Sequence, residues 1–283
     1  MTKQSRGAEG SRDRRAQPRS PDPHWRTALT AIEPNKILIR GYPVDELMGR
    51  LDFGEAVYLL LRGELPSPSI GKLMGAVLVS SLDHGVTPPS TLASRNVATT
   101  GTSLQACVAA GILGFGPYHG GDIESCMRFL DTGLGLVRNG MTYEEAAHEV
   151  VEAYLEAPPP GFGHRIHTQD PRTARLFQMA HELELDGEHI RMIGSVERVL
   201  NRRHGNDGTQ RIPINVDGAI AAVCADLGFD PAQGNALFII SRVTGLVGHA
   251  LEEQSRQTPM RQIDPKDLIY DGPADRRLPE TRK

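Results

Sequence analysis

Four polar side chains stand in turn-forming stretches between apolar segments, at positions where they could transfer protons. His84, His119 and His164 each lie next to a glycine, and four glycines surround His119 within residues 114–121. Asp217 is the carboxylate of an otherwise apolar stretch that opens a helix. Glycine lets a ligand approach the backbone closely, and a loop held by buried helices can position side chains while excluding water. Such a set suits acid and base catalysis at a carbon atom.

Each of these residues also has a simpler interpretation when it is taken alone. His84 fits a polar turn that caps the C-terminus of a helix, and Asp217 fits a helix N-cap. The segment around His164 fits a surface loop with a solvated arginine. Arg242 is harder to explain structurally, because a cation within the apolar helical stretch 236–251 is costly unless an anion pairs with it.

The sequence lacks the patterns of several other enzyme classes. It has neither a His-x-x-x-His pair with a third ligand nor clustered carboxylates, so no metal site is predicted. It also lacks a Gly-x-Ser-x-Gly elbow, a P-loop and a dinucleotide-binding glycine pattern after a strand. What remains is histidines, one aspartate and arginines such as Arg172, which opens a helix directly after Pro171. Guanidinium groups bind carboxylates in a bidentate manner, so this set favours a carboxylate-rich substrate.

Composition and charge narrow the functional classes further. A net charge of -4 and a pI near 6.2 give no global reason to bind nucleic acid or an anionic membrane. No apolar run approaches the ~18 residues that span a bilayer, and no signal-peptide core follows Met1. Cys107, Cys126 and Cys224 lie in apolar stretches without paired spacing, which indicates buried free thiols. We therefore expect a cytoplasmic protein.

The periodicity of apolar residues predicts an all-α protein that positions these side chains. Residues 1–21 are rich in Arg, Ser, Gly and Pro and are predicted to form a disordered basic tail, whereas residues 22–283 form one catalytic unit. Short strand-like pieces are expected within residues 25–39. The small apolar helix 103–113 is expected to cross the middle of the protein. The predicted helices are 44–61 with a break near Gly54, 70–82, 91–97, 103–113, 124–136, 142–155, 172–183, 189–200, 219–227 and 231–254.

The motifs, taken in order, resemble those of the citrate synthase superfamily from about Ile39 to Gly272. The likeness rests on Gly41-Tyr42-Pro43 with the stretch 58–66, and on six site motifs: Asp83-His84, Pro117-Tyr118-His119-Gly120-Gly121, Gly161-Phe162-Gly163-His164, Asp170-Pro171-Arg172, Asn215-Val216-Asp217 and Ser241-Arg242-Val243. The resemblance implies a large helical domain of about residues 22–160 plus 240–283 and a smaller helical domain of about 161–239. It places the active site in the cleft between them.

The resemblance also implies a role for each matching residue. Asp217 is expected to remove a proton from the methyl group of acetyl-CoA, and neutral His119 to stabilise the resulting enolate. His164 is expected to polarise and protonate the ketone of the acceptor, oxaloacetate. His84, Arg172, Arg242 and Arg261 would bind that acceptor, with Arg261 reaching the site of the neighbouring subunit of a homodimer. Gly161, Phe162, Gly163 and Arg165 would contact coenzyme A, and beyond this thioester substrate no cofactor or metal is implied.

Departures from the synthase pattern favour cleavage over condensation. The chain is short, Asp83-His84 continues as Gly-Val-Thr-Pro-Pro-Ser, and the segment from His164 to Arg172 is one residue shorter than in typical bacterial synthases. The stretches 215–220 and 245–249 are closer to the citryl-CoA lyase module, including the one within ATP-citrate lyase. We therefore predict citryl-CoA lyase activity, with citrate synthase or a 2-methylcitrate-type synthase as the alternative. A silent binding or assembly subunit would lack His119, His164 or Asp217, and all three are present.

Several conspicuous residues are given structural roles only. His167 is interpreted as a loop histidine and His249 as a satisfied helix histidine. Glu252 and Glu253 are interpreted as a solvated helix end, and Arg276 and Arg277 as a frayed tail. Solvated positions are also predicted for the remaining histidines, His148, His181, His189 and His204.

Overall fold

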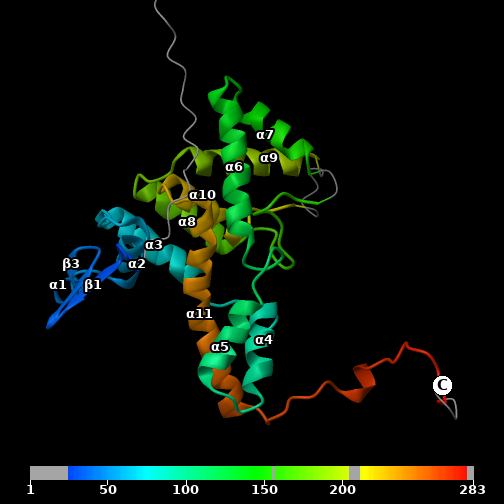
Figure 1. Ribbon diagram of the computed structural model, residues 1–283. Helices are drawn as coiled ribbons and strands as arrows, with labels where there is room; N and C mark the ends of the chain where they lie inside the picture. The colour runs from blue at the N-terminus through cyan, green and yellow to red at the C-terminus, as the bar shows by residue number, and fades with distance from the viewer. Residues whose placement is uncertain (1–24, 155–156, 204–210, 279–283) are drawn as a thin grey trace, which may run out of the picture.

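The computed structural model describes residues 25–154, 157–203 and 211–278, and this part of the chain is predominantly helical (Figure 1). The predicted all-α class is confirmed. The predicted tail 1–21 and His204 lie outside the described residues. None of the helices in the described ranges is both long and apolar enough to cross a bilayer.

A small antiparallel sheet opens the described chain. Strands β1 (Thr30–Glu33), β2 (Lys36–Ile39) and β3 (Tyr42–Pro43) pair in the order β1-β2-β3, in agreement with the strand-like pieces expected there. A short helix α1 (Val44–Leu47) follows the sheet. Sheet and helix lie at one side of the molecule (Figure 1) and contain no fully buried residue, so the main core is built elsewhere.

Two packed helices come next. The predicted segment 44–61, with its break near Gly54, forms α1 and α2 (Phe53–Arg62), and α2 starts where Asp52 and Glu55 form a capping box. Helix α3 (Pro68–Ser80) packs on α2. Gly54 permits this contact, since a Cβ there would lie 2.7 Å from the backbone nitrogen of Gly75. The loop that carries His84 leaves the end of α3.

The main core forms around a buried helix, α10 (Val216–Asp226), whose residues from Gly218 to Cys224 are all buried. This helix contacts four others: α6 (Asp122–Arg138), α8 (Pro171–Glu182), α9 (Glu188–Arg203) and α11 (Pro231–Arg256). Helix α7 (Tyr143–Glu152) starts with a capping box formed by Thr142 and Glu145 and packs on α6 and α9. The predicted division into a large and a small domain stays a prediction.

Helix α11 runs from this core down to a second helical pair, α4 (Pro89–Ala98) and α5 (Leu104–Leu113), as Figure 1 shows. The prediction that α5 crosses the middle of the protein is wrong for the single chain. Only Cys107 and Gly111 of this helix are buried, and Leu113 is 85% exposed. The reason is that α5 packs against α4 and α11 on one side, while its apolar residues occupy nearly its whole circumference.

The chain after α11 leaves the helical body. Residues 257–278 contain one short 3-10 turn, η1 (Pro265–Asp267), and extend away from the other elements (Figure 1). Several large apolar side chains of this segment are exposed, including Ile269 at 85% and Tyr270 at 78%. Only its beginning is anchored, where the N–H of Met260 donates to the carbonyl of Thr99.

Candidate active site

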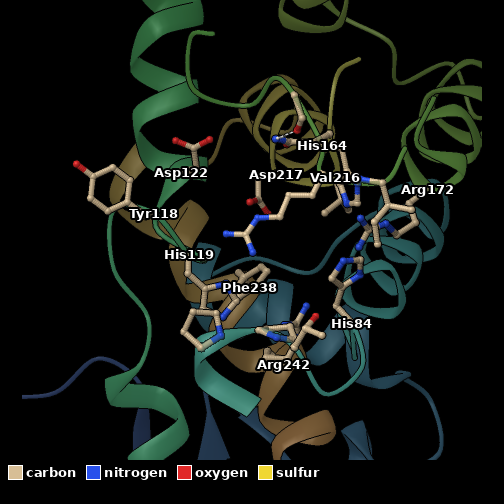
Figure 2. Close-up of a pocket in the computed structure, with 18 of the residues that line it drawn as sticks. His84, Tyr118, His119, Asp122, His164, Arg172, Val216, Asp217, Phe238 and Arg242 are labelled. Carbon is tan, nitrogen blue, oxygen red and sulfur yellow. Dashed lines mark hydrogen bonds between the residues drawn. The ribbon is translucent and has the colours of Figure 1, made fainter. Parts of the chain in front are cut away.

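A cavity of about 490 Å³ lies where the main core meets the α4–α5 pair. Segments far apart in the sequence line it: the loop after α3, the loop between α5 and α6, the loop before α8, and helices α8, α10 and α11. Figure 2 shows the polar side chains around this space. The structure thereby brings together most of the residues singled out from the sequence, namely His84, His119, His164, Arg165, Arg172, Asp217 and Arg242.

Asp217 lies in the first turn of α10 and presents a carboxylate to the cavity. The alternative that it caps the helix is wrong, because Asn215 is the N-cap and accepts the N–H of Gly218 at 3.0 Å. Oδ1 of Asp217 is shielded from solvent and has no hydrogen-bond partner in the described part of the chain. Burial, and secondarily the negative charge of Asp122, raise the pKa of Asp217 from 3.8 to about 6. This carboxyl group can therefore exchange a proton near neutral pH.

His119 projects from a tight turn in which Gly116 and His119 exchange backbone hydrogen bonds. Its Nε2 lies 2.7 Å from Oγ of Ser90, and its ring contacts Phe115 and Phe238 at centroid distances of 5.5 and 6.1 Å. Burial first, and then the nearby charge of Arg242, lower the pKa of His119 from 6.5 to about 4. The imidazole is therefore neutral at pH 7 and can serve as an uncharged hydrogen-bond donor, as predicted for enolate stabilisation.

His164 and His84 face each other across the cavity with their rings edge to face at 5.5 Å. Nδ1 of His164 accepts the backbone N–H groups of Ile166 at 3.1 Å and His167 at 3.0 Å, so in the neutral ring Nε2 carries the proton. Burial is the main cause that lowers the pKa of both His84 and His164. Two neutral imidazoles thus stand beside each other.

Arg172 and Arg242, two of the three arginines that line the cavity, are held in different ways. Arg172 forms a bidentate ion pair with Asp170, with Nε–Oδ1 at 3.0 Å and Nη2–Oδ2 at 2.7 Å. Nε of Arg242 donates to the carbonyl of Ser81 at 2.8 Å, and its guanidinium lies 4.8 Å from the ring centroid of Phe238. The direct anionic partner expected for Arg242 is missing among the described residues, and its buried Nη1 has no hydrogen-bond partner there. A ligand carboxylate would satisfy this group.

Comparisons with known proteins agree with this geometry. Residues 66–263 match the family model described as citrate synthase, C-terminal domain. The chain belongs to the citrate synthase family. It is 32% identical over 231 residues to citrate synthase 2 of Bacillus subtilis, a match that covers 79% of this chain and 58% of that protein. The chain thus spans little more than half the length of this curated relative.

Two solved structures show how far the likeness extends. The structure described as citryl-CoA lyase from Hydrogenobacter thermophilus is 42% identical, with a TM-score of 0.81, and the match covers 90% of this chain and 97% of that one. ATP citrate lyase from Methanothrix soehngenii shares the fold, with a TM-score of 0.75 at 21% identity, and the match covers 91% of this chain and 43% of that one.

In this citrate synthase family member, hydrogen bonds fix the glycine loop before His164 to α6 and to the start of α10. The N–H of Gly161 donates to Oδ2 of Asp122 at 2.7 Å, and its carbonyl accepts the N–H of Asn215 at 3.0 Å. Gly161 has φ +85°, and a Cβ there would lie 2.5 Å from Sγ of Cys126. Gly161 and Phe162 are buried and do not line the cavity, whereas Gly163 and Arg165 do. The contact of all four with coenzyme A stays a prediction.

Arg261 lies outside the cavity of its own chain, in the segment that follows α11. Its guanidinium pairs with Glu253, with Nε–Oε1 at 2.9 Å and Nη2–Oε2 at 2.6 Å, and its backbone N–H donates to Oγ1 of Thr99. The predicted contact of Arg261 with a neighbouring site stays a prediction.

Two structural interpretations from the sequence are wrong. Glu253 does not belong to a solvated helix end, because its side chain is fully buried between Arg95 and Arg261. His189 is not solvated either: it joins α9 to Asp226 at 2.8 Å and to Asp131 at 3.1 Å. In both cases the partner lies on another helix, which periodicity along one segment does not reveal. His148 is exposed as predicted, and the three cysteines are buried and free.

Four residues that support the site received no role of their own from the sequence, although Asp170 and Asn215 lie within the motifs quoted there. Asp122 lines the cavity, Ser90 contacts His119, Asp170 orients Arg172, and Asn215 caps α10. Asp122 had a usable signal, since it follows two glycines at the start of a helix. Ser90 had none, because it meets His119 only through the packing of α4 beside the loop that precedes α6.

Proposed function

We propose that this chain cleaves citryl-CoA into acetyl-CoA and oxaloacetate. The observation that carries the proposal is the convergence of Asp217, His119 and His164 with two arginines on one cavity. The similarity to a structure described as citryl-CoA lyase supports it, because that match covers 97% of the other chain at 42% identity.

In this proposal each side chain acts on one part of citryl-CoA. Arg172 and Nη1 of Arg242, which has no partner among the described residues, bind substrate carboxylates, and His84 lies beside them. When the carbon–carbon bond breaks, its electrons enter the enolate of the acetyl thioester, which His119 stabilises as a neutral donor. As the ketone of oxaloacetate forms, the proton of the substrate hydroxyl passes to Nε2 of His164, which gives its own proton to solvent.

Asp217 completes the cleavage by giving its proton to the methylene carbon, which becomes the methyl group of acetyl-CoA. Asp217, after protonating the carbon, is reprotonated from solvent, so that no net proton is gained or lost. Its protonated form is therefore the one that acts in cleavage, and its ionised form acts in condensation. A pKa of about 6 makes both forms accessible near neutral pH. No metal or further organic cofactor takes part in the proposed reaction. Activity that survives dialysis against EDTA would support this last point, and its loss would contradict it.

The test compares the products that purified protein forms from synthetic citryl-CoA. Faster release of oxaloacetate than of free citrate supports the lyase, provided that Asp217→Asn abolishes the release. Free citrate as the main product, or CoA set free from acetyl-CoA and oxaloacetate, identifies a citrate synthase instead. If neither product forms, the assignment of an enzyme or of its acceptor is wrong.

Citrate synthase is the second candidate, because the same cavity serves condensation and the chain is 32% identical to citrate synthase 2 of Bacillus subtilis. A 2-methylcitrate-type synthase differs from it only in pocket volume for one methylene, which is worth about 1–3 kcal/mol of discrimination. Parallel assays with acetyl-CoA and propionyl-CoA separate these two.

We further propose a cytoplasmic homodimer whose contact includes α5. Leu92, Leu113 and Leu251 are 54%, 85% and 50% exposed and lie on the α4, α5 and α11 elements that pack together. Apolar surface of this kind is typical of association sites. Light scattering should give about twice the chain mass of 30.8 kDa, and Leu113→Asp should lower it. A monomeric wild type at micromolar concentration would contradict the proposal. The cytoplasmic location rests on the free thiols of the three cysteines.

A further inference from the structure

His249 connects the body of α11 to the loop that carries His84. Its side chain is 12% exposed, with Nε2 at 2.9 Å from Oδ1 of Asp83 and Nδ1 at 3.2 Å from Nη1 of Arg95. An arginine nitrogen can only donate, so Nδ1 of His249 must accept this hydrogen bond. The proton of the neutral ring therefore sits on Nε2 and is donated to the carboxylate of Asp83.

Asp83 in turn fixes the loop on both sides of His84. Its Oδ2 accepts the N–H of Gly85 at 2.9 Å, and Gly85 has φ +75°, a conformation that favours glycine. The loop also lies directly on α11, because a Cβ at Gly245 would overlap the carbonyl oxygen of Leu82. His84 is thus the residue between two anchored neighbours, and its ring direction depends on the carboxylate that His249 holds.

The other side of His249 is held just as firmly. Arg95, whose side chain is 10% exposed, donates from Nε to Oε2 of the fully buried Glu253 at 2.7 Å. Glu253 also accepts from Arg261 at 2.6 Å. A continuous series of polar contacts therefore runs from Arg261, in the segment after α11, to the cavity loop.

We propose that His249 is a positioning residue, which as its Nε2–H tautomer holds the Asp83 carboxylate against α11 and so directs the His84 ring into the cavity. His249 does not line the cavity, so it acts on a ligand only through His84. The inference rests on the proposed function, in which His84 holds the oxaloacetate part of the substrate.

A purely structural role would have a different signature. Asp83 is 44% exposed, and a hydrogen bond to a partly solvated carboxylate contributes little to stability. Loss of the contact should therefore change the thermal midpoint little and the affinity for the oxaloacetate part strongly. Coenzyme A thioesters are expected to contact the loop 161–165 rather than His84, so their affinity should be unaffected by His249.

The experiment compares His249→Leu, which has no donor for Asp83, with His249→Gln, whose amide nitrogen can replace Nε2. Calorimetric titration with oxaloacetate should show affinity weakened about tenfold or more in the Leu variant, the loss expected for one hydrogen bond to a charged group, and largely restored in the Gln variant. The affinity for acetyl-CoA should change less than about twofold in both. His181→Gln, at a side chain that is 81% exposed, is the matched control and should change neither affinity.

Three outcomes separate the hypotheses. Wild-type oxaloacetate affinity in a folded His249→Leu variant, or equal losses for oxaloacetate and acetyl-CoA, overturns the positioning role while leaving the proposed function intact. If the Leu variant does not fold, long-range 1H–15N spectra of the wild type decide, because a proton on Nδ1 of His249 contradicts the tautomer. A wild type that binds neither oxaloacetate nor acetyl-CoA removes the proposed function and this inference with it.

Discussion

Replacement of Asp122 by asparagine tests whether one carboxylate adjusts the proton affinity of another. Asp122 opens α6, lines the cavity with Asp217 (Figure 2), and accepts the N–H of Gly161 through Oδ2 at 2.7 Å. Burial is the largest cause that raises the pKa of Asp217 to about 6, and the charge of Asp122 is the next. An asparagine amide oxygen can still accept the N–H of Gly161, so the substitution removes the charge and keeps the loop contact.

The size of the effect is bounded by the structure. The rise in the pKa of Asp217 from 3.8 to about 6 changes the free-energy difference between its two protonation states by about 3 kcal/mol. Asp122→Asn leaves burial in place, so the pKa of Asp217 should fall only part of this way. Cleavage needs protonated Asp217, so the cleavage rate of the variant should begin to decline at a lower pH. At pH 8 the loss should be less than about a hundredfold, and below the pKa of the variant the two rates should converge.

The assay measures kcat/KM for citryl-CoA cleavage between pH 4.5 and 8.5 by chromatography of quenched samples, because this parameter reports the free enzyme. Asp122→Ala is the companion variant, since it removes both the charge and the acceptor for Gly161, and it should be less active than Asp122→Asn at every pH. In the condensation direction the lower pKa of Asp217 should raise the rate at acidic pH, because Asp217 then stays ionised down to a lower pH. A profile for Asp122→Asn that superimposes on the wild type, or moves to higher pH, would refute the reasoning.

Three further predictions concern other parts of the molecule. Gly161→Ala should destabilise the protein by about 1–3 kcal/mol in urea unfolding, because its Cβ would lie 2.5 Å from Sγ of Cys126 at φ +85°; the helical Gly194→Ala, with nothing nearer than 3.7 Å, should not. Burial lowers the pKa of His189, but hydrogen bonds to two carboxylates outweigh it and raise the pKa above 6.5. The stability lost in His189→Gln should therefore be largest below pH 6.5 and should vanish as the pH rises through the folded-state pKa of His189. Equal losses at pH 5.5 and 9 would contradict this. Arg242→Leu should lower kcat/KM about 30-fold or more, equivalent to about 2 kcal/mol of transition-state stabilisation, without lowering the thermal midpoint, since Nη1 is buried and unpartnered among the described residues. A cleavage rate unchanged by this variant would exclude Arg242 from substrate binding.

Local features of the chain could be predicted wherever their cause lies within a few residues. The capping box of Thr142 and Glu145 was visible in the sequence, as was the helix that starts at Pro171. The helical class followed from periodicity, and the site motifs indicated the family that the comparisons confirm. The break near Gly54 within the predicted helix 44–61 was visible in the sequence, but the capping box at Asp52, which sets the start of α2 at Phe53, was not identified.

Long-range partners account for the remaining errors. Arg95 and Glu253 are separated by 158 positions, and only the packing of α4 beside α11 makes them a buried pair. The exposure of α5 likewise depends on which neighbours cover it. Its apolar composition predicted burial, but a single chain covers only one of its sides.

The sequence by itself determined the helical class, the glycine-rich turns and the types of side chain available for acid and base catalysis, because these depend on residue chemistry and local spacing. Tertiary structure decided the protonation behaviour and orientation of those side chains. The raised pKa of Asp217, the lowered pKa of His119 and the tautomer of His249 all arise from burial and from neighbours on other helices. Such effects depend on distances through space, which the order of residues along the chain does not contain.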